Sequence, residues 1–273
     1  MGGVLKRYVG GWPVRTSVDR PHRVVSALID VGGLIGILGV WQLVAWRRIV
    51  DPFWISSPLG VANAVWQLAR TGQLFGDLLY TVSTAFIGLA LALIVSLPIV
   101  GLLTFSPFAE RVLEPLLGFV YAIPKVALIP VLILTLGLGE TSQVVLVLLL
   151  VVFIFIYNLR AGSREVDVRL VAALEILGAS RRDVLMHVRV PTMISYAISA
   201  MRIAGPTALT AAIFAEYFAG AGQGGLGQLI YESSLFFHTS DLFAGAIVLV
   251  PVAYGLDRAL QRWSSKTSSW RSA

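Results

Sequence analysis

Apolar stretches long enough to cross a bilayer recur along the chain and are separated by shorter polar segments. A membrane-spanning helix needs about 20 mostly apolar residues. Six stretches meet that length, at 28–46, 80–103, 116–138, 143–161, 193–218 and 241–260. The pattern therefore predicts an all-α polytopic membrane protein with six transmembrane helices. It divides the chain into an N-terminal tail (1–27), a six-span domain (28–262) with a polar loop at 160–191, and a C-terminal tail (263–273).

Composition supports a membrane protein. Of the 273 residues, 57% are hydrophobic and 13% charged, whereas soluble domains are about 25% charged. The net charge of +6 does not indicate nucleic-acid binding, because the basic residues flank the predicted spans. Sixteen of the 21 Lys and Arg residues fall on the side of both tails and the 160–191 loop, and three on the other side. The positive-inside rule therefore predicts that both termini and this loop lie in the cytoplasm.

Two segments on the predicted outer side have distinct patterns. In 47–79, Ser57 and Pro58 read as a helix N-cap followed by proline at the first helical position. A short interfacial helix is expected there. The second segment, 219–240, carries five glycines between Gly220 and Gly227 and no Lys or Arg.

The 160–191 loop is a long polar stretch between two predicted spans. Residues 166–177 are good helix formers, and Gly178 can end that helix. Ser180 precedes Asp183 by three residues, the spacing of a capping box that starts another helix. The pattern predicts a helix–turn–helix at the membrane surface, with Pro191 at the entry to the next span. An ordinary polar connection between spans is the alternative.

This loop resembles the Glu-Ala-Ala loop of bacterial binding-protein-dependent ABC importer permeases. Gly178–Ser180 and Val190–Pro191 match the family pattern at the expected separation. Other segments, at matching order and spacing, are similar to the aliphatic sulfonate/taurine/nitrate permeases: Ala122–Pro130, Leu136–Gly139, Met201–Ala204, Ala215–Glu216 and Gly225–Ile230. The resemblance runs from about Pro58 to Arg262.

The resemblance implies a type I ABC importer permease (MetI-like) fold. It also implies import of a small, anionic solute such as a sulfonate, taurine or nitrate. Thiamine-precursor pyrimidines are an alternative cargo of similar permeases. The expected partners are a second permease copy in a homodimer, two ATPase subunits that bind ATP and magnesium, and an extracytoplasmic solute-binding protein. That protein would dock on the 47–79 and 219–240 surfaces.

In the family, the loop forms a coupling helix that sits in a groove of the ATPase. The matching residues here are Ala172, Ala173, Leu174, Glu175, Gly178, Ala179, Ser180, Arg181 and Pro191. One residue departs from the pattern, because Ala172 stands where the family has glutamate. Glu175 shares a helix face with Ala172 and could supply the missing carboxylate.

Three ionisable residues lie inside predicted spans and are candidates for the translocation path. Lys125 and Arg202 fall near mid-membrane on different spans, and Glu216 lies on the face of Arg202, too far along the helix to pair with it. The cations could form a midpoint on the route of an anion. Alternatively, they satisfy carbonyls that Pro130 and Pro206 leave without donors, or a buried carboxylate.

Enzymatic chemistry is not indicated. The chain has no cysteine, and His22, His187 and His238 lie far apart, so no metal site is predicted. No G-x-x-x-x-G-K-[ST] motif is present, so ATP hydrolysis needs another subunit. A G-x-G-x-x-G match at Gly220–Gly225 follows a span instead of a strand, which argues against nucleotide binding. A membrane enzyme, or a secondary transporter or channel without an ATPase, remains as a rival.

Overall fold

The computed structural model describes residues 23–166 and 168–267. Within these residues the chain is helical and contains no strand. The elements are α1 (Arg23–Trp46), α2 (Pro52–Ile55), α3 (Pro58–Arg70), α4 (Gln73–Phe105), α5 (Pro107–Ala122), η1 (Lys125–Leu128), α6 (Ile129–Leu136), α7 (Glu140–Arg164), α8 (Val168–Ile176), α9 (Arg181–Val184), η2 (Leu185–Arg189), α10 (Val190–Ala219), α11 (Leu226–Leu235) and α12 (Thr239–Thr267). The all-α membrane architecture predicted from the hydropathy pattern is confirmed.

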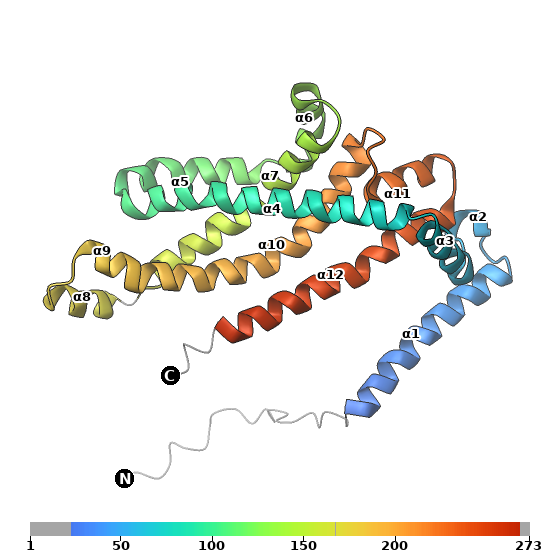
Figure 1. Cartoon of the computed structure of the whole chain (residues 1–273), viewed down its shortest axis with the longest axis horizontal. Coiled ribbons are helices and arrows are strands. Elements are labelled where there is room, and N and C mark those ends of the chain that lie inside the picture. Colours follow the sequence, from blue (N-terminus) through green and yellow to red (C-terminus); the bar gives the residue numbers. More distant parts are fainter. Residues whose placement is uncertain (1–22, 167, 268–273) are drawn as a thin grey trace, which may run out of the picture.

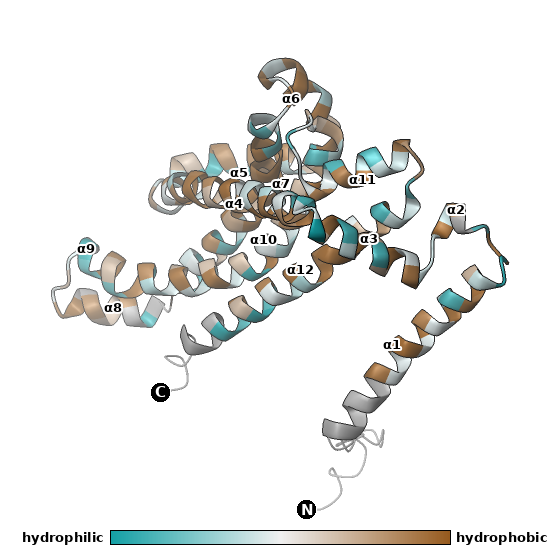
Figure 2. Ribbon diagram, turned by 45° about the vertical axis from the view of Figure 1, so that its right-hand side comes forward, coloured by the Kyte–Doolittle hydropathy of each residue, from teal (hydrophilic) through white to brown (hydrophobic). Residues whose placement is uncertain are grey.

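The molecule is elongated, and its two ends differ. Helices α8 and α9 lie at one end of the long axis, and α2, α3 and α11 lie at the other (Figure 1). We call these the loop end and the opposite end. Between them α4, α7 and α10 pack together as the core, and apolar residues dominate their ribbons (Figure 2).

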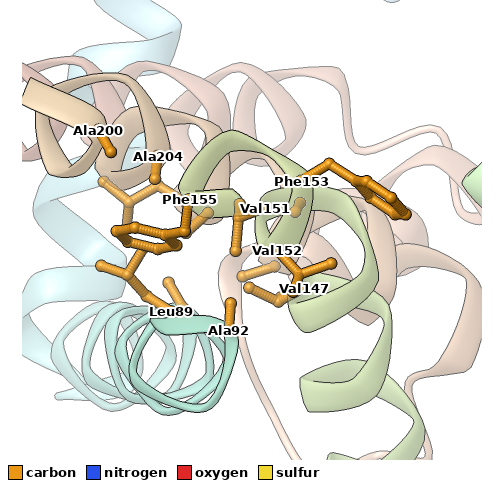
Figure 3. Packing of buried hydrophobic residues seen from close by; sticks show 14 of the residues in the cluster. Leu89, Ala92, Val147, Val151, Val152, Phe153, Phe155, Ala200 and Ala204 are labelled. Carbon is orange, nitrogen blue, oxygen red and sulfur yellow. The ribbon is translucent and has the colours of Figure 1, made fainter. Parts of the chain in front are cut away.

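The core forms where small residues let helices approach closely. Phe155 of α7 is fully buried and lies beside Ala200 and Ala204 of α10, with Leu89 of α4 below it (Figure 3). Gly88 of α4 faces Val147 so tightly that an added Cβ would lie 2.5 Å from the valine Cβ. In a bilayer, helix association relies on such close packing, because lipid tails are as apolar as the side chains they would replace.

Four of the predicted spans are confirmed as long apolar helices. They are Gln73–Phe105, Glu140–Arg164, Arg182–Ala219 and Thr239–Arg262. The predicted first span lies in α1, where Val31–Trp46 forms a shorter apolar helix. The six-span count is therefore confirmed only in part.

The predicted third span, 116–138, needs a correction, because it is not one straight helix. Pro107–Ala122 and Lys125–Leu136 are bent by 81° at the break between them. Ile123 is extended, at φ −67° and ψ 128°, because a residue before proline, here Pro124, is sterically driven out of the helical region. The first half also begins earlier than predicted. Ser106 alone separates it from α4 and caps it by accepting from the Ala109 N–H at 3.2 Å.

The predicted tails overlap with helices. Helix α1 begins at Arg23, inside the segment predicted as the N-terminal tail, and α12 continues to Thr267. Residues 1–22 and 268–273 lie outside the described part of the chain.

Candidate functional site

The polar loop forms the predicted helix–turn–helix. Helix α8 ends at Ile176, and Gly178 takes the left-handed conformation at φ +85°. The Ala179 N–H donates to the Leu174 carbonyl at 3.0 Å, which closes the helix end in the manner of a Schellman motif. Gly178 therefore turns the chain between the two helices, as its position in the sequence predicted.

The predicted capping box is also present. The Ser180 N–H donates to Asp183 Oδ2 at 2.9 Å, and the Asp183 N–H donates to Ser180 Oγ at 3.3 Å. The two side chains thus satisfy donors that the first turn of α9 leaves free. Both residues are exposed, so these hydrogen bonds lie at the surface of the loop.

The tip of the loop is apolar and uncovered. Ile176 is 85% exposed and Leu177 81% exposed, while Ala172 and Ala173 are also exposed and Leu174 is half-buried. Apolar side chains that project from a polar loop are typical of a surface that a protein partner covers. The side chains of Glu175 and Arg181 lie outside the described residues, so the proposed substitution of Glu175 for the family glutamate stays a prediction.

Pro191 lies in the first turn of α10, at the predicted entry to the span. The helix is nevertheless continuous through α9, η2 and α10, and η2 is a π-helical turn. The Val190 N–H donates to the Leu185 carbonyl, five residues back. Because Pro191 has no N–H for a carbonyl four residues back, this wider turn lets the helix pass the proline without a break.

Lys125 lies at the break between α5 and η1. Its ammonium donates to the carbonyl of Tyr121, which the end of α5 leaves without a helical donor. The same ammonium lies over two rings, 4.5 Å from the centre of Tyr121 and 4.9 Å from that of Phe153. Lys125 thus caps the C-terminus of α5. The sequence offered the alternative that Lys125 satisfies a carbonyl freed by Pro130. The structure places Lys125 on a backbone carbonyl, but on that of Tyr121.

Arg202 has a different environment. Its side chain is exposed on α10 and forms no ion pair with any described residue. Ser199 and Thr210 are exposed too, and half-buried Ser195 lies on the same face of the helix. Arg202 therefore belongs to a polar face of an otherwise apolar helix.

Glu216 lies in the interior. It is 0% exposed, and its Oε2 accepts from Thr81 Oγ1 at 2.8 Å and from the Gly227 N–H at 2.9 Å. Asp77 Oδ1 accepts from the Gly225 N–H at 2.9 Å, and Thr81 Oγ1 accepts from the Leu226 N–H at 2.9 Å. Three side chains from α4 and α10 thus cap the first turn of α11 and hold the glycine-rich segment before it. The sequence shows Asp77 and Glu216, but no pattern in it indicates that they accept hydrogen bonds from the start of α11.

The structure separates the three predicted path residues. Lys125 caps α5, Arg202 faces outward from α10, and Glu216 is enclosed within the chain. Arg202 is the member whose side chain is exposed and has no ion-pair partner among the described residues.

A cluster of ion pairs joins α5 to α7 at the loop end. Glu110 accepts from both Arg160 and Arg164, the latter at 2.7 Å, and Glu114 lies 3.6 Å from Arg160 and 3.4 Å from Arg164. Sequence reasoning missed this cluster because it assigned both arginines to the polar loop. The structure extends α7 to Arg164, and Arg160 is buried.

The two outer segments predicted to form a docking surface lie side by side. Ser56 and Ser240 share a hydrogen bond of 2.7 Å, and the rings of Phe53 and Phe237 stack at 5.2 Å. Ser57 caps α3 as predicted, by accepting from the Gly60 N–H at 3.1 Å. The segments 47–79 and 219–240 therefore contribute to one surface at the opposite end.

Comparison with known proteins adds to this geometry. The model of the family described as binding-protein-dependent transport system inner membrane component matches residues 86–266. The chain is 24% identical to the taurine transport system permease protein TauC of Escherichia coli (strain K12), over 95% of this chain and 92% of that protein. It is 29% identical to the putative aliphatic sulfonates transport permease protein SsuC of the same organism, over 84% and 89%.

A third relative has another cargo in its name. The riboflavin transport system permease protein RibX of Chloroflexus aurantiacus is 31% identical, over 85% of this chain and 88% of that protein. Among solved structures, the inward-facing MetNI methionine ABC transporter matches with a TM-score of 0.59 and 20% identity, over 74% of this chain and 97% of the matched chain. This structural likeness concerns the fold.

Proposed function

The chain belongs to the family of binding-protein-dependent transport system inner membrane components and is a permease of an ABC importer, and we propose that its cargo is a small organic anion of the sulfonate class. ATP hydrolysis in this family is the task of a separate ATPase, and a binding protein is the other partner that the family implies. The cofactors ATP and magnesium would be bound by that ATPase.

The proposed cargo rests on the environment of Arg202. A cation in a membrane-spanning helix costs about 2.5–3.5 kcal/mol even on the mildest scale, so it must meet protein, water or an anion. Arg202 has no ion-pair partner among the described residues and shares its face with Ser199 and Thr210. A guanidinium binds a sulfonate through two parallel hydrogen bonds, which fits the cargo named for two relatives.

An aromatic heterocycle is the second candidate cargo. It is favoured by the riboflavin permease among the relatives and is the same chemical class as the pyrimidine cargo considered from the sequence. For such a solute, stacking would matter more than charge, and Arg202 would be dispensable.

We further propose how the assembly works. Two copies of the chain line one path, and each presents the apolar tip around Ile176 and Leu177 to an ATPase subunit. The loop end faces the cytoplasm with both termini, in the plasma membrane, and the binding protein docks on the opposite end. ATP binding draws the loops together and rocks the spans between inward-open and outward-open states.

Reconstitution tests the function and the cargo together. The permease would be co-expressed with an ATPase and a binding protein encoded by adjacent genes, purified, and placed in vesicles. We expect ATP-dependent uptake of taurine or a simple alkanesulfonate, and stable co-purification of the ATPase. Uptake that needs no ATPase would support a secondary transporter, whereas uptake of riboflavin alone would support the heterocycle.

Arg202→Gln is expected to reduce sulfonate uptake with little change in melting temperature. Loss of a hydrogen bond to a charged group costs about 1.5–3 kcal/mol, which corresponds to roughly a tenfold or greater fall in kcat/KM.

Lys125→Gln is expected to lower the melting temperature more than Arg202→Gln does, because it removes a helix cap and two ring contacts. Uptake and detergent melting would be measured for both variants.

The conservative variant Arg202→Lys provides the control, since it keeps the positive charge but not the fork-shaped donor. It should retain part of the uptake. A large fall in melting temperature for Arg202→Gln, with uptake lost in proportion, would instead assign Arg202 a structural role.

A further inference from the structure

A cavity of about 300 Å³ lies at the loop end, where the ends of α4, α5 and α7 meet the segment before α8 and the η2 turn. Polar residues on its wall come from α4, α5, α7 and η2: Thr104, Glu110, Arg160, Ser163, Arg164 and Arg189. The segment before α8 contributes Val166, and α8 contributes Val171. The cavity therefore lies where the 160–191 loop, which we call the coupling loop, joins the membrane-spanning core.

The described residues of the wall carry an excess of positive charge. They include three arginines and one carboxylate, that of Glu110. Glu110 is shared by Arg160 and Arg164, so one negative charge serves two guanidiniums. Arg189 forms no ion pair with any described residue. Glu114 lies near the first two arginines but is not part of the cavity wall, and its side chain is 52% exposed.

Arg160 points to a missing acceptor. The residue is only 6% exposed, and it donates through Nη1 to the Leu103 carbonyl at 3.2 Å and through Nη2 to Glu110. Its Nε–H is buried and has no hydrogen-bond partner in the described part of the chain. A buried donor without a partner costs about 1–3 kcal/mol, so an acceptor supplied by a ligand would stabilise this end of α7.

We propose that this cavity binds a tetrahedral oxyanion, such as sulfate or a phosphate group, between Arg160, Arg164 and Arg189. Guanidinium groups match the oxygen geometry of such anions through paired hydrogen bonds. The oxyanion would join α7 to η2 and so hold the coupling loop against the core. Its source is either a free inorganic anion or the phosphate of an anionic lipid, because basic sites between membrane helices bind lipid headgroups.

Binding can be measured on the full purified permease without its partners. In a neutral detergent, we expect saturable binding of labelled sulfate or inorganic phosphate in equilibrium dialysis. We also expect the anion to raise the melting temperature through mass action. Arg189→Gln should weaken binding at least tenfold and remove this shift. Arg189 is the primary test because its loss breaks no ion pair among the described residues, whereas Arg160→Gln disturbs the packing of α5 on α7.

Arg182→Gln is the matched control, since Arg182 is an exposed arginine of the same loop and does not line the cavity. It should bind like the wild type, and it corrects for general salt effects on melting. Binding that is absent, or that is equal in Arg189→Gln and the wild type, would overturn the proposal.

Nanodiscs distinguish the two sources. In phosphatidylcholine discs, which contain no anionic lipid, sulfate should bind whether the natural occupant is a free anion or a lipid phosphate. In phosphatidylglycerol discs, loss of sulfate binding would identify the lipid phosphate as the occupant, and undiminished binding would identify the free anion. The role of the oxyanion in coupling rests on the proposed function, whereas its binding does not. The binding assay uses no transport, so a failed oxyanion site and a failed cargo assignment would be told apart.

Discussion

Gly178→Val is expected to prevent stable assembly with the ATPase while the membrane-spanning core remains folded. Gly178 holds φ +85° between α8 and α9, and an added Cβ would meet no atom within 4 Å. The penalty therefore comes from the left-handed backbone conformation. It costs an L-residue about 1–2 kcal/mol, and the cost is largest for a β-branched side chain. To relieve it, the chain must abandon the turn and move the exposed tip at Ile176 and Leu177.

The yield of ATPase in a pull-down, and ATP-driven uptake in vesicles, would measure this effect. Ala172→Val is the control, because it adds the same side chain on the exposed surface of α8 without changing a left-handed residue. Gly178→Asn should recover much of the assembly, since asparagine tolerates the left-handed conformation. Equal yields for the two valine variants would refute the role assigned to the turn.

Glu216→Ala is expected to lower the melting temperature by roughly 10 °C. The change leaves the Gly227 N–H without its acceptor and removes the bond from Thr81, in a region where Glu216 is 0% exposed. Each buried group left unpaired costs about 1–3 kcal/mol, and one kcal/mol shifts the melting temperature of a chain of about this size by roughly 2–4 °C. The first turn of α11 should loosen together with the glycine segment that precedes it.

Two further variants isolate the cause. Glu216→Gln keeps an oxygen acceptor and should melt well above Glu216→Ala. Glu140→Gln removes an exposed carboxylate from the start of α7 and should melt close to the wild type. If Glu216→Gln instead melted normally but lost uptake, Glu216 would belong to the translocation path, as the sequence alone had suggested.

The local features of this protein follow from short stretches of its sequence. Runs of about 20 apolar residues predicted the spans, and four of these are long apolar helices in the structure. The turn at Gly178, the box of Ser180 and Asp183 and the cap at Ser57 were each readable within a few residues. In each of these the donor and acceptor are sequence neighbours, so the pattern that encodes the bond also locates it.

The bend near Pro124 was also encoded locally, but the apolar run across it concealed the break. Hydropathy measures how well a segment tolerates lipid and is insensitive to the conformation of the residue before a proline. The local signal was present at Ile123, although the span prediction rested on apolar length and counted one helix.

Only the tertiary structure decided the partners of the buried charges. Glu216 meets Thr81 across 135 residues of sequence, and Asp77 meets Gly225 across 148. Arg160, assigned to the polar loop by its charge, is buried beside Glu110 at the cavity wall, 50 residues away in the chain. An apolar pattern fixes which helices lie in the membrane, but neither the direction in which each helix faces nor its depth against its neighbours. Close packing of α4, α7 and α10 sets both, and so determines which charges become paired.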